Sequence, residues 1–383
     1  MKVLLVSHTC QSRTEGQPKA FELARLGIEL CVVVPRKWMH YGQWRESQVP
    51  ENAPFRYEVL DAKWPWCGPA QSYLHFYPGM GALLREFKPD VIDLWEEPWG
   101  LVSLHTLRLR NRLCPNVPLV SETEQNIDKR LPPPFEPMRS RVLKGADFVV
   151  GRNAQSLEIV KRKGYAGPSR VVPNAVDAEL FHPLTAQERQ AKRAALGWGE
   201  GEFWCGYVGR LVEEKGIADL IDALALCDSS VRVALVGDGP FKGELEAQIE
   251  RLALKDRVQF RAGVPAAELA PIMASLDALV LPSRTTASWK EQFGRVLIEA
   301  NACGVAAVGS DSGAIPDVVG SGGRIFPECN PQALAKVLDE LAANPAEARR
   351  MGEEGRRVVL ERYTWARVAE AMKGIYEELL AAK

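Results

Sequence analysis

Short apolar runs alternate with helical patterns along the whole chain of 383 residues. This alternation predicts parallel β-sheets with helices on both faces, because a crossover between parallel strands is usually a helix. In the first half of the chain, strands are predicted at residues 1–7, 28–35, 90–94, 117–121, 147–151 and 170–172. Helical patterns lie between them at residues 17–26, 71–87, 101–113 and 154–163.

The series restarts after a segment that holds Pro173 and Pro183 and has no clean periodicity. Strands are then predicted at residues 203–208, 231–236, 258–261, 278–281, 305–308 and 324–326, and helices at residues 216–227, 242–254, 294–302, 331–341, 345–362 and 364–380. We therefore predict an α/β protein with two doubly wound domains that face a central cleft. The expected boundaries are 1–173 for the first domain, 174–183 for a linker and 184–363 for the second domain. The last helical segment, 364–383, is expected to pack back on the first domain.

The net charge of −1 excludes a generally basic, nucleic-acid-binding chain. The charge is unevenly distributed, since residues 1–173 hold 24 Lys or Arg against 18 Asp or Glu, a balance of +6. The remaining residues hold 24 against 31, a balance of −7. Two domains with different partners would explain this split, and so would drift in surface composition.

No apolar run reaches the roughly 18 residues of a membrane span, and no signal peptide is visible at the start. The eight cysteines include no Cys-x-x-Cys pair, which disfavours a zinc ribbon. They are typical of buried thiols in a reducing compartment, so we expect a cytoplasmic protein.

Loops after the predicted strands of the second half carry the groups that suggest chemistry. After residues 203–208, Gly209 permits a sharp turn, and Arg210 and Lys215 stand five residues apart. A guanidinium and an ammonium at this spacing can hold one phosphate-like anion. The alternative is a pair of solvated surface charges.

The loop after residues 278–281 is the most informative one. It contains Glu291 and leads into a helix that begins near Gly294, where free amides and the helix dipole favour an anion. Glu291 can face ligand hydroxyls, and Glu299 stands in an otherwise apolar helix, where an unpaired carboxylate is costly to bury. Glu299 is therefore a candidate for a ribose diol, or else a partly exposed helical residue.

Several motifs occur in order, each at the end of a predicted strand. They are Tyr207-Val-Gly-Arg210 with Lys215-Gly216, Val236-Gly-Asp-Gly-Pro240, Phe260-Arg-Ala-Gly263, and Glu291 followed by Glu299 with Phe293-Gly294 between them. This set resembles the retaining GT-B glycosyltransferases of family four. The resemblance implies two Rossmann-like domains, the first for the acceptor and the second for a nucleotide-sugar donor.

The resemblance also implies a role for each residue of the motifs. Arg210, Lys215 and Glu291 would be the catalytic residues, with the two cations on the diphosphate and Glu291 on hydroxyls of the donor sugar. Glu299 would bind the ribose hydroxyls. The remaining donor-binding positions would be Gly16, Gly209, Ala262, Gly263, Phe293, Gly294, Arg295 and Val296.

Negative charge develops on the leaving nucleoside diphosphate when a donor sugar departs. Preorganised positive groups stabilise that charge. The sequence has no Asp-x-Asp pair of the kind that holds a divalent cation in many transferases. The absence of this pair favours transfer without a metal, and we expect no cofactor. The family resemblance further implies a UDP- or GDP-linked donor and transfer with retention of configuration.

The acceptor side is less regular. His8 follows the first predicted strand, where a structural role is the alternative, and only Gly16 stands where many family members have a glycine pair. Many members carry a histidine near residues 122–126, but here Glu124, Gln125 and Asn126 are the candidates, with a helix-capping loop as the alternative.

Two further features concern possible partners. Aromatic residues such as Trp64 and Trp66 could stack on a sugar or a lipid tail. Basic residues at 108, 110, 112 and 161–163 permit peripheral binding to an anionic membrane on its inner face, or form a solvated surface. The expected partners are thus the donor and a sugar, glycan or lipid acceptor, without nucleic acid.

Three functions remain open from the sequence. The first is sugar transfer to a hydroxyl acceptor. The second is a nucleotide-sugar epimerase or a phosphorylase on the same fold, which fold analogy alone does not separate from transfer. The third is a non-catalytic protein that binds a nucleotide-sugar.

Overall fold

The computed structural model describes residues 1–40, 43–63 and 73–382. The chain forms two compact units, residues 1–173 with 365–383, and residues 174–364. Residues 174–183, where the sequence predicts a linker, belong to the second unit, and Val176 and Phe181 are buried in its core. Trp64, Trp66 and Cys67 lie outside the described residues.

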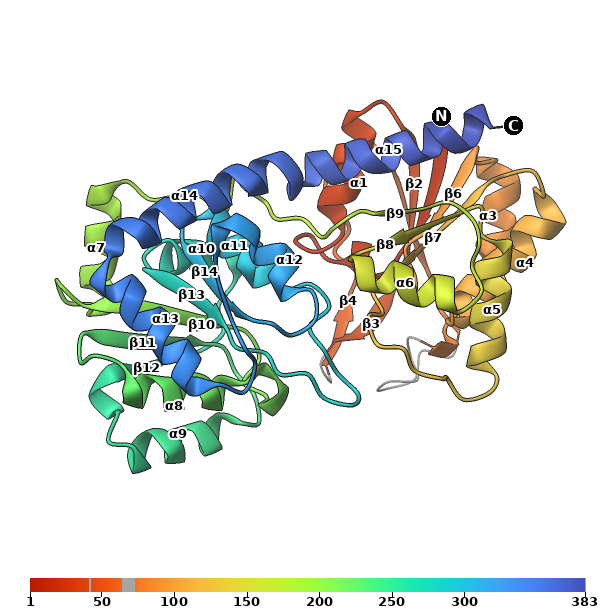
Figure 1. Cartoon of the computed structure of the whole chain (residues 1–383). Helices are drawn as coiled ribbons and strands as arrows, with labels where there is room; N and C mark the ends of the chain where they lie inside the picture. Colours follow the sequence, from red (N-terminus) through yellow and green to blue (C-terminus); the bar gives the residue numbers. More distant parts are fainter. Residues whose placement is uncertain (41–42, 64–72, 383) are drawn as a thin grey trace. The chain divides into compact units, whose positions relative to one another are not determined.

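The first unit is built on a seven-stranded sheet (Figure 1). Its strand order is β5 (Arg56–Leu60), β2 (Glu29–Pro35), β1 (Lys2–Val6), β6 (Val91–Leu94), β7 (Leu119–Thr123), β8 (Phe148–Gly151) and β9 (Ser169–Val171), all parallel. The chain adds β2 and β5 on one side of β1 and β6 to β9 on its other side, so the direction of strand addition reverses at β1. The loops after β1 and β6 therefore lie next to each other at a topological switch point, where α/β sheets bind ligands.

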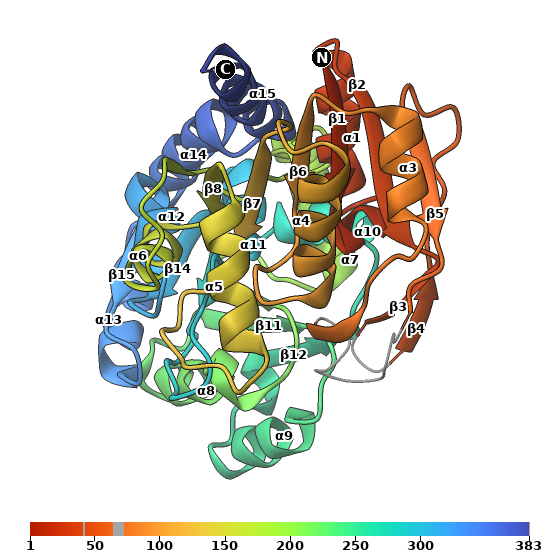
Figure 2. The same ribbon diagram turned by 90° about the vertical axis from the view of Figure 1, so that its right-hand side faces the viewer.

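Helices cover both faces of this sheet. Helices α3 (Met80–Phe87), α4 (Leu101–Leu113) and α5 (Phe135–Gly145) lie over one face (Figure 2). Helices α1 (Gln17–Arg25) and α15 (Trp365–Ala381) pack against each other on the other face. Helix α6 (Ala154–Arg162) connects β8 to β9. The last helix of the chain is therefore part of the first unit.

The second unit has a six-stranded parallel sheet. Its order is β12 (Val258–Arg261), β11 (Val231–Val236), β10 (Phe203–Val208), β13 (Ala278–Leu281), β14 (Ala306–Ser310) and β15 (Gly323–Phe326). Its main helices are α7 (Ala186–Leu196), α8 (Ile217–Leu226), α9 (Lys242–Arg251), α10 (Ala266–Met273), α11 (Arg295–Ala302), α12 (Ile315–Val319), α13 (Pro331–Ala343) and α14 (Pro345–Arg362). The switch point here lies between β10 and β13.

Most predicted strands and helices are present, and the differences have local causes. The antiparallel pair β3 (Lys37–His40) and β4 (Gln43–Glu46) and the half-buried edge strand β5 lack the apolar runs that predict a strand. Helices α5 and α10 each contain a proline inside the helix, which disguises the pattern. The start predicted at residue 71 for α3 lies outside the described residues, and the helix itself begins at Met80.

The central strands of both sheets are buried on both faces, as is usual for parallel strands, whereas the edge strands β5, β9, β12 and β15 are partly exposed. The described cysteines are unpaired, and five of the seven are buried. Among the described helices, none combines the length and the apolar character that a membrane span needs.

Candidate functional site

Three loops of the second unit meet beyond the carboxyl ends of β10, β11 and β13. We call residues 209–216, 237–240 and 282–294 together the loop site. Gly216 has a φ of 67°, and a Cβ there would lie 1.9 Å from the carbonyl oxygen of Pro282. Gly237 has a φ of 143°, and a Cβ there would lie 1.9 Å from the carbonyl oxygen of Gly209. Only glycine fits both positions, so the backbones of the loops can touch.

Lys215 and Glu291 form the centre of the loop site. Lys215 Nζ lies 2.7 Å from Glu291 Oε2, which also accepts a hydrogen bond of 3.0 Å from the Ser283 hydroxyl. The ammonium lies 4.8 Å from the ring centroid of Trp289. The side chains of Lys215 and Glu291 are 17% and 9% exposed, so the pair is largely but not completely buried. It can present donors to an anion and acceptors to hydroxyls.

Arg210 stands on the same loop at a position fixed by its own backbone. Its carbonyl oxygen accepts a hydrogen bond of 2.7 Å from the hydroxyl of Tyr207, a fully buried side chain. The guanidinium is 44% exposed and lies 4.0 Å from Glu214. A second cation thus stands five residues from Lys215 with its side chain partly exposed.

Helix α11 begins at the loop site. Its N-cap is Gly294 with a φ of 80°, where a Cβ would lie 2.8 Å from Leu281 Cδ2. The amides at Arg295 and Val296 have no partner within the helix, as at any helix start. The Phe293 ring is buried against Tyr363, with centroids 5.9 Å apart, so only the main chain of Phe293 is available to a ligand.

Glu299 lies one turn further along α11 and is half-buried. Burial raises the pKa of its carboxyl above the usual range, although the nearby Arg295 lowers it in part. In the described part of the chain this carboxylate has no hydrogen-bonding partner. Such a group is suited to accept bonds from a ligand diol.

The end of β12 adjoins the second loop of the site. The Gly263 amide donates to Asp238 Oδ2 at 2.9 Å, and the Gly237 amide donates to the carbonyl oxygen of Arg261 at 2.9 Å. The Arg261 side chain is bound to Gln259 and to the Leu196 carbonyl. At this edge the Gly263 amide is thus bound by a side chain, and the Gly237 amide is bound by main chain.

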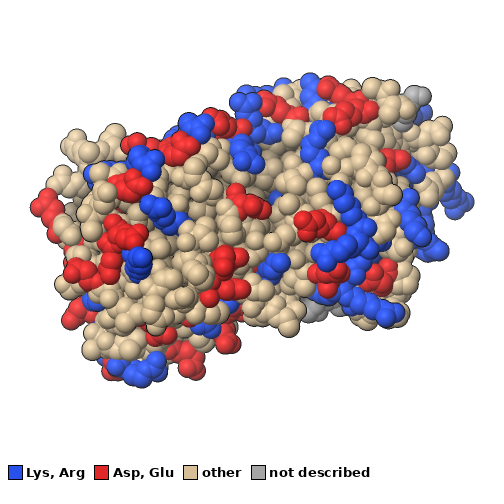
Figure 3. Space-filling model, viewed as in Figure 1, with Lys and Arg blue, Asp and Glu red and all other residues tan. Residues whose placement is uncertain are grey.

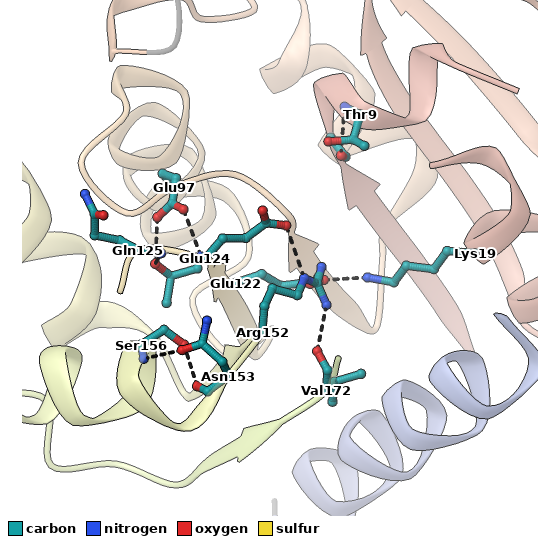
Figure 4. Close-up of polar contacts among 12 residues, drawn as sticks. Thr9, Lys19, Glu97, Glu122, Glu124, Gln125, Arg152, Asn153, Ser156 and Val172 are labelled. Atoms are coloured by element: carbon teal, nitrogen blue, oxygen red, sulfur yellow. Dashed lines mark hydrogen bonds and ion pairs between the residues drawn. The ribbon is translucent and has the colours of Figure 1, made fainter. Parts of the chain in front are cut away.

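The first unit has a small cavity at its own switch point. We call it the acidic pocket; its volume is about 130 Å³, and it is lined by His8, Thr9, Trp95, Glu96, Glu97, Glu122, Thr123 and Glu124. These residues follow β1, β6 and β7, or end β7. Figure 4 labels four of them, Thr9, Glu97, Glu122 and Glu124. The pocket thus gathers four carboxylates at the carboxyl edge of the sheet.

His8 is held on one side of the acidic pocket. Its Nδ1 lies 2.8 Å from Glu96 Oε2, its amide donates to Glu96 Oε1 at 2.6 Å, and its ring stacks on Trp38 with centroids 4.5 Å apart. Burial lowers the pKa of His8, but the Glu96 carboxylate outweighs this effect and the pKa is raised. Burial acts against ionisation of Glu96 as well, yet His8 holds the pKa of that carboxyl below its usual range.

Glu122 is paired rather than free. It is 1% exposed, accepts a hydrogen bond of 2.5 Å from Lys19 Nζ, and forms an ion pair with Arg152 (Figure 4). Lys19 also lies 3.0 Å from Asp93, and both cations lie over the faces of Trp95. Two buried cations thereby balance two buried carboxylates, as burial of charge requires.

The next residues form the wall of the acidic pocket. Glu124 Oε1 lies 3.4 Å from Arg152 Nε, and the Glu124 side chain is 37% exposed. Gln125 and Asn126 are buried. The structure therefore brings His8 and Glu124 to one cavity, and places Gln125 and Asn126 behind its wall.

Comparison with known proteins identifies part of the chain directly. Residues 188–358 match the family model described as Glycosyl transferases group 1. This part of the chain belongs to that family. The family resemblance predicted from the loop motifs is thus confirmed, because the loop site lies within the matched residues.

Relatives and solved structures extend the comparison over the chain. A GDP-mannose-dependent alpha-(1-6)-phosphatidylinositol monomannoside mannosyltransferase of Mycolicibacterium smegmatis is 34% identical over 223 residues, which cover 54% of this chain and 58% of that protein. The chain spans between 48% and 65% of the length of the first curated relatives it matches.

Two solved structures show the fold. Sucrose-phosphate synthase of Thermosynechococcus elongatus matches all of both chains at 22% identity with a TM-score of 0.78. The Anabaena protein HepE in complex with UDP matches 99% of this chain and 100% of its own at 21% identity with a TM-score of 0.75. The predicted GT-B fold class, with two doubly wound parallel sheets, is confirmed.

The group 1 motifs led to the loop site but left part of the first unit unrecognised. Gly16 has a packing role, since a Cβ there would lie 2.5 Å from the amide nitrogen of Cys10, and its own amide donates to the Ser12 carbonyl. The sequence reasoning missed Lys19, Asp93, Glu96, Glu97 and Arg152. A charge inside an apolar strand was the signal that could have found Asp93, whereas the other four residues carry no such signal.

Within the three described ranges, no cluster of histidine, cysteine, aspartate and glutamate is arranged to hold a metal ion. Lys215 and Glu291, which the motifs predict as separate contacts, are in direct contact.

Proposed function

We propose that this chain is a glycosyltransferase that moves a sugar from a nucleotide-sugar to a hydroxyl acceptor with retention of configuration. The observation that carries the proposal is the Lys215–Glu291 pair. It lies in the loop site, whose loops approach one another at glycines, and beside the start of α11. It joins a cation for a diphosphate to a carboxylate for sugar hydroxyls. The names of the relatives, which mention GDP-mannose and UDP, support a GDP- or UDP-linked donor.

In this proposal the loop site stabilises the leaving group. As the bond between the anomeric carbon and the phosphate oxygen breaks, negative charge grows on the diphosphate. Lys215, Arg210 and the amides at the start of α11 face that charge, and fixed donors need no reorganisation during the reaction. These groups supply the positive charge that a divalent cation provides elsewhere, so we propose transfer without a metal.

Other residues of the loop site bind the rest of the donor. Glu291, held by Lys215 and Ser283, takes hydroxyls of the sugar, and Glu299 takes the ribose diol. The main chain at Ala262 and Gly263 faces the base. The acceptor, a glycan, a lipid or a small metabolite, enters the acidic pocket of the first unit beside His8 and Glu124.

The test is sugar transfer measured against panels of donors and acceptors. Lys215→Ala should lower turnover by roughly 10²–10³-fold, the usual loss for one preorganised donor. Lys255→Ala is the matched control, because Lys255 is an exposed lysine of the same unit that pairs with Glu250. Near-normal turnover of Lys215→Ala, or activity abolished by EDTA, would contradict the scheme. Isomerised donor would favour an epimerase, and phosphate-dependent cleavage would favour a phosphorylase. Tight binding of UDP or GDP without turnover would favour a non-catalytic protein.

We also propose that the first unit binds an anionic membrane surface with the face around α5 and α6. Lys and Arg side chains gather there, with Asp and Glu between them (Figure 3). Lys161 is exposed, and Arg162 is exposed although it lies 3.3 Å from Asp128, whereas Arg110 is bound to Asp147 and to the Val117 carbonyl. Each basic residue near such a surface contributes about 1 kcal/mol. Binding of this kind would hold a cytoplasmic protein on the inner face of the membrane. Liposome flotation should show recovery only with anionic lipid; equal recovery with neutral lipid would end the idea.

A further inference from the structure

We infer that Glu97 is a positioning residue of the acidic pocket, which holds the main chain of Thr123 and Glu124 so that the Glu124 carboxylate faces the acceptor. The inference rests on the proposed function, because it assigns Glu124 to the acceptor. Neither the sequence motifs nor the relatives point to Glu97.

Glu97 bridges the loops that follow two neighbouring strands. The strands β6 and β7 pair in parallel, with Leu94 opposite Ser121. Three residues beyond that pair, Glu97 Oε2 accepts a hydrogen bond of 2.6 Å from the Thr123 hydroxyl. Glu97 Oε1 accepts one of 2.8 Å from the Glu124 amide (Figure 4). Both oxygens of one carboxylate are thus used to fix two successive residues.

Glu97 is itself fixed by the start of α4. Its carbonyl oxygen accepts hydrogen bonds from the Ser103 hydroxyl at 2.8 Å and from the Gly100 amide at 3.0 Å. Its carboxylate is therefore attached to a helix and not to a freely moving loop. Because Glu97 is bound both to the start of α4 and to residues 123 and 124, it restricts the movement of those two residues relative to the helix.

Arg152 contacts the side chain of Glu124, whose main chain is bound by Glu97. It lies 3.4 Å from Glu124 Oε1, and it is anchored by the buried Glu122 and by the Val172 carbonyl at 3.1 Å. The backbone of Glu124 is thus set by Glu97 and its side chain by Arg152. Since Glu97 and Glu124 both line the pocket, loss of either contact should change where the Glu124 carboxylate points.

Chemistry separates this positioning role from a role of the Glu97 charge. A glutamine at the same place can accept from the Glu124 amide through its oxygen and donate to Thr123 through its nitrogen, because a hydroxyl can also accept. Glu97→Gln keeps both contacts without the charge, whereas Glu97→Ala removes both. The pair of variants therefore tests the clamp and the charge independently.

The first experiment needs no activity. Amide hydrogen exchange of the full chain should show the Glu124 amide exchanging at least about tenfold faster in Glu97→Ala than in the wild type. Glu97→Gln should leave this rate nearly unchanged. Glu136→Ala is the control, because the Glu136 carboxylate on α5 also accepts from a backbone amide, that of Leu131, and it should not change the exchange of the Glu124 amide. Unchanged exchange in Glu97→Ala overturns the inference.

The second experiment is a double-mutant cycle on acceptor kcat/KM. We expect Glu97→Ala and Glu124→Gln each to lower it about 10- to 100-fold, since a misplacement of about 1 Å has this effect. If Glu97 acts through Glu124, the double variant should be little worse than Glu124→Gln alone. Fully additive losses, or a loss in Glu97→Gln equal to that in Glu97→Ala, overturn the inference.

Donor affinity separates this inference from the proposed function. Calorimetric titration with UDP and GDP should give the same dissociation constants for the wild type and for Glu97→Ala, Glu97→Gln, Glu124→Gln and the double variant, because the loop site belongs to the other unit. A wild type that transfers no sugar refutes the proposed function. A wild type that transfers sugar while the cycle is additive refutes the role of Glu97 alone.

Discussion

At the scale of single residues, Glu97 links the acidic pocket to stability. Burial is the main reason why the pKa of its carboxyl is raised from its ordinary value of 4.5 to about 7, although Thr123 and the Glu124 amide oppose the rise. Between these pH values the folded state retains a proton that the unfolded state has released. The free energy of unfolding therefore falls as the pH rises through this window.

The variant Glu97→Gln should remove this dependence. Its free energy of unfolding should equal that of the wild type below pH 4.5 and exceed it above pH 7 by up to about 3 kcal/mol, measured by urea unfolding across this range. Glu96→Gln is the control with the opposite sign. The pKa of Glu96 is lowered, so that variant should lose stability above pH 4.5. Parallel pH curves for wild type and Glu97→Gln would contradict the assignment.

Sequence reasoning reached the loop site at this scale because its residues stand in motifs with fixed spacing. Lys215 and Glu291 are 76 positions apart, yet each follows a recognisable strand. It could not reach Glu97 or Arg152, because their roles depend on which strands are neighbours. That information lies in the order of the sheet and not in the local pattern.

At the scale of elements, the loop of residues 282–294 is fixed to α8 by one ion pair. Arg284 donates to both oxygens of Asp219, at 2.6 and 2.7 Å, and its amide donates to the Glu214 carbonyl at 2.9 Å. Asp219 is 4% exposed and stands in the first turn of α8, where the helix dipole favours an acid. The loop that carries Glu291 thus depends on a buried carboxylate.

We expect Arg284→Ala to weaken UDP or GDP binding by about tenfold and to lower the free energy of unfolding by about 1–3 kcal/mol, because it leaves Asp219 unpaired. Thermal shift with and without nucleotide measures both effects. Arg232→Ala is the matched control, since its pair with Glu202 is half-buried in the same unit. Stability should fall there without a change in nucleotide affinity. Equal nucleotide binding by wild type and Arg284→Ala would show that the anchor is not needed.

Elements with a strong local pattern were predicted closely, as with α14 at Pro345–Arg362. Those that depend on neighbours were missed, such as the edge strand β5, whose side chains are all half-buried. An edge strand gains its conformation from pairing with β2 rather than from its own apolar residues.

At the scale of the whole molecule, α15 packs on the first unit with several buried side chains and is also linked to its sheet by a buried hydrogen bond. The Tyr376 hydroxyl donates to Asp93 Oδ2 at 2.6 Å, and both side chains are fully buried. Asp93 in turn lies 3.0 Å from Lys19, which also binds Glu122. The end of the chain therefore completes the charge cluster behind the acidic pocket.

We expect Tyr376→Phe to lower the free energy of unfolding by about 1.5–3 kcal/mol, the usual loss for a hydrogen bond to a charged group. Tyr77→Phe is the matched control. Tyr77 is equally buried in the same unit, and its hydroxyl has no partner in the described part of the chain. Urea unfolding of both variants measures the free energy of unfolding. Equal losses in Tyr376→Phe and Tyr77→Phe would mean that the hydrogen bond to Asp93 does not stabilise the fold.

The division of the first unit has a consequence for synthesis on the ribosome. The unit combines residues 1–173 with residues 365–383. The hydrogen bond from Tyr376 to Asp93 therefore cannot form until the intervening residues 174–364 have been synthesised. At about 5–20 residues per second this delay is on the order of 10–40 s. The second unit is continuous and emerges in one piece. The half that begins the chain is thus the last to be finished, and nascent chains stalled before residue 365 should be protease-sensitive in the first unit while the second is already protected.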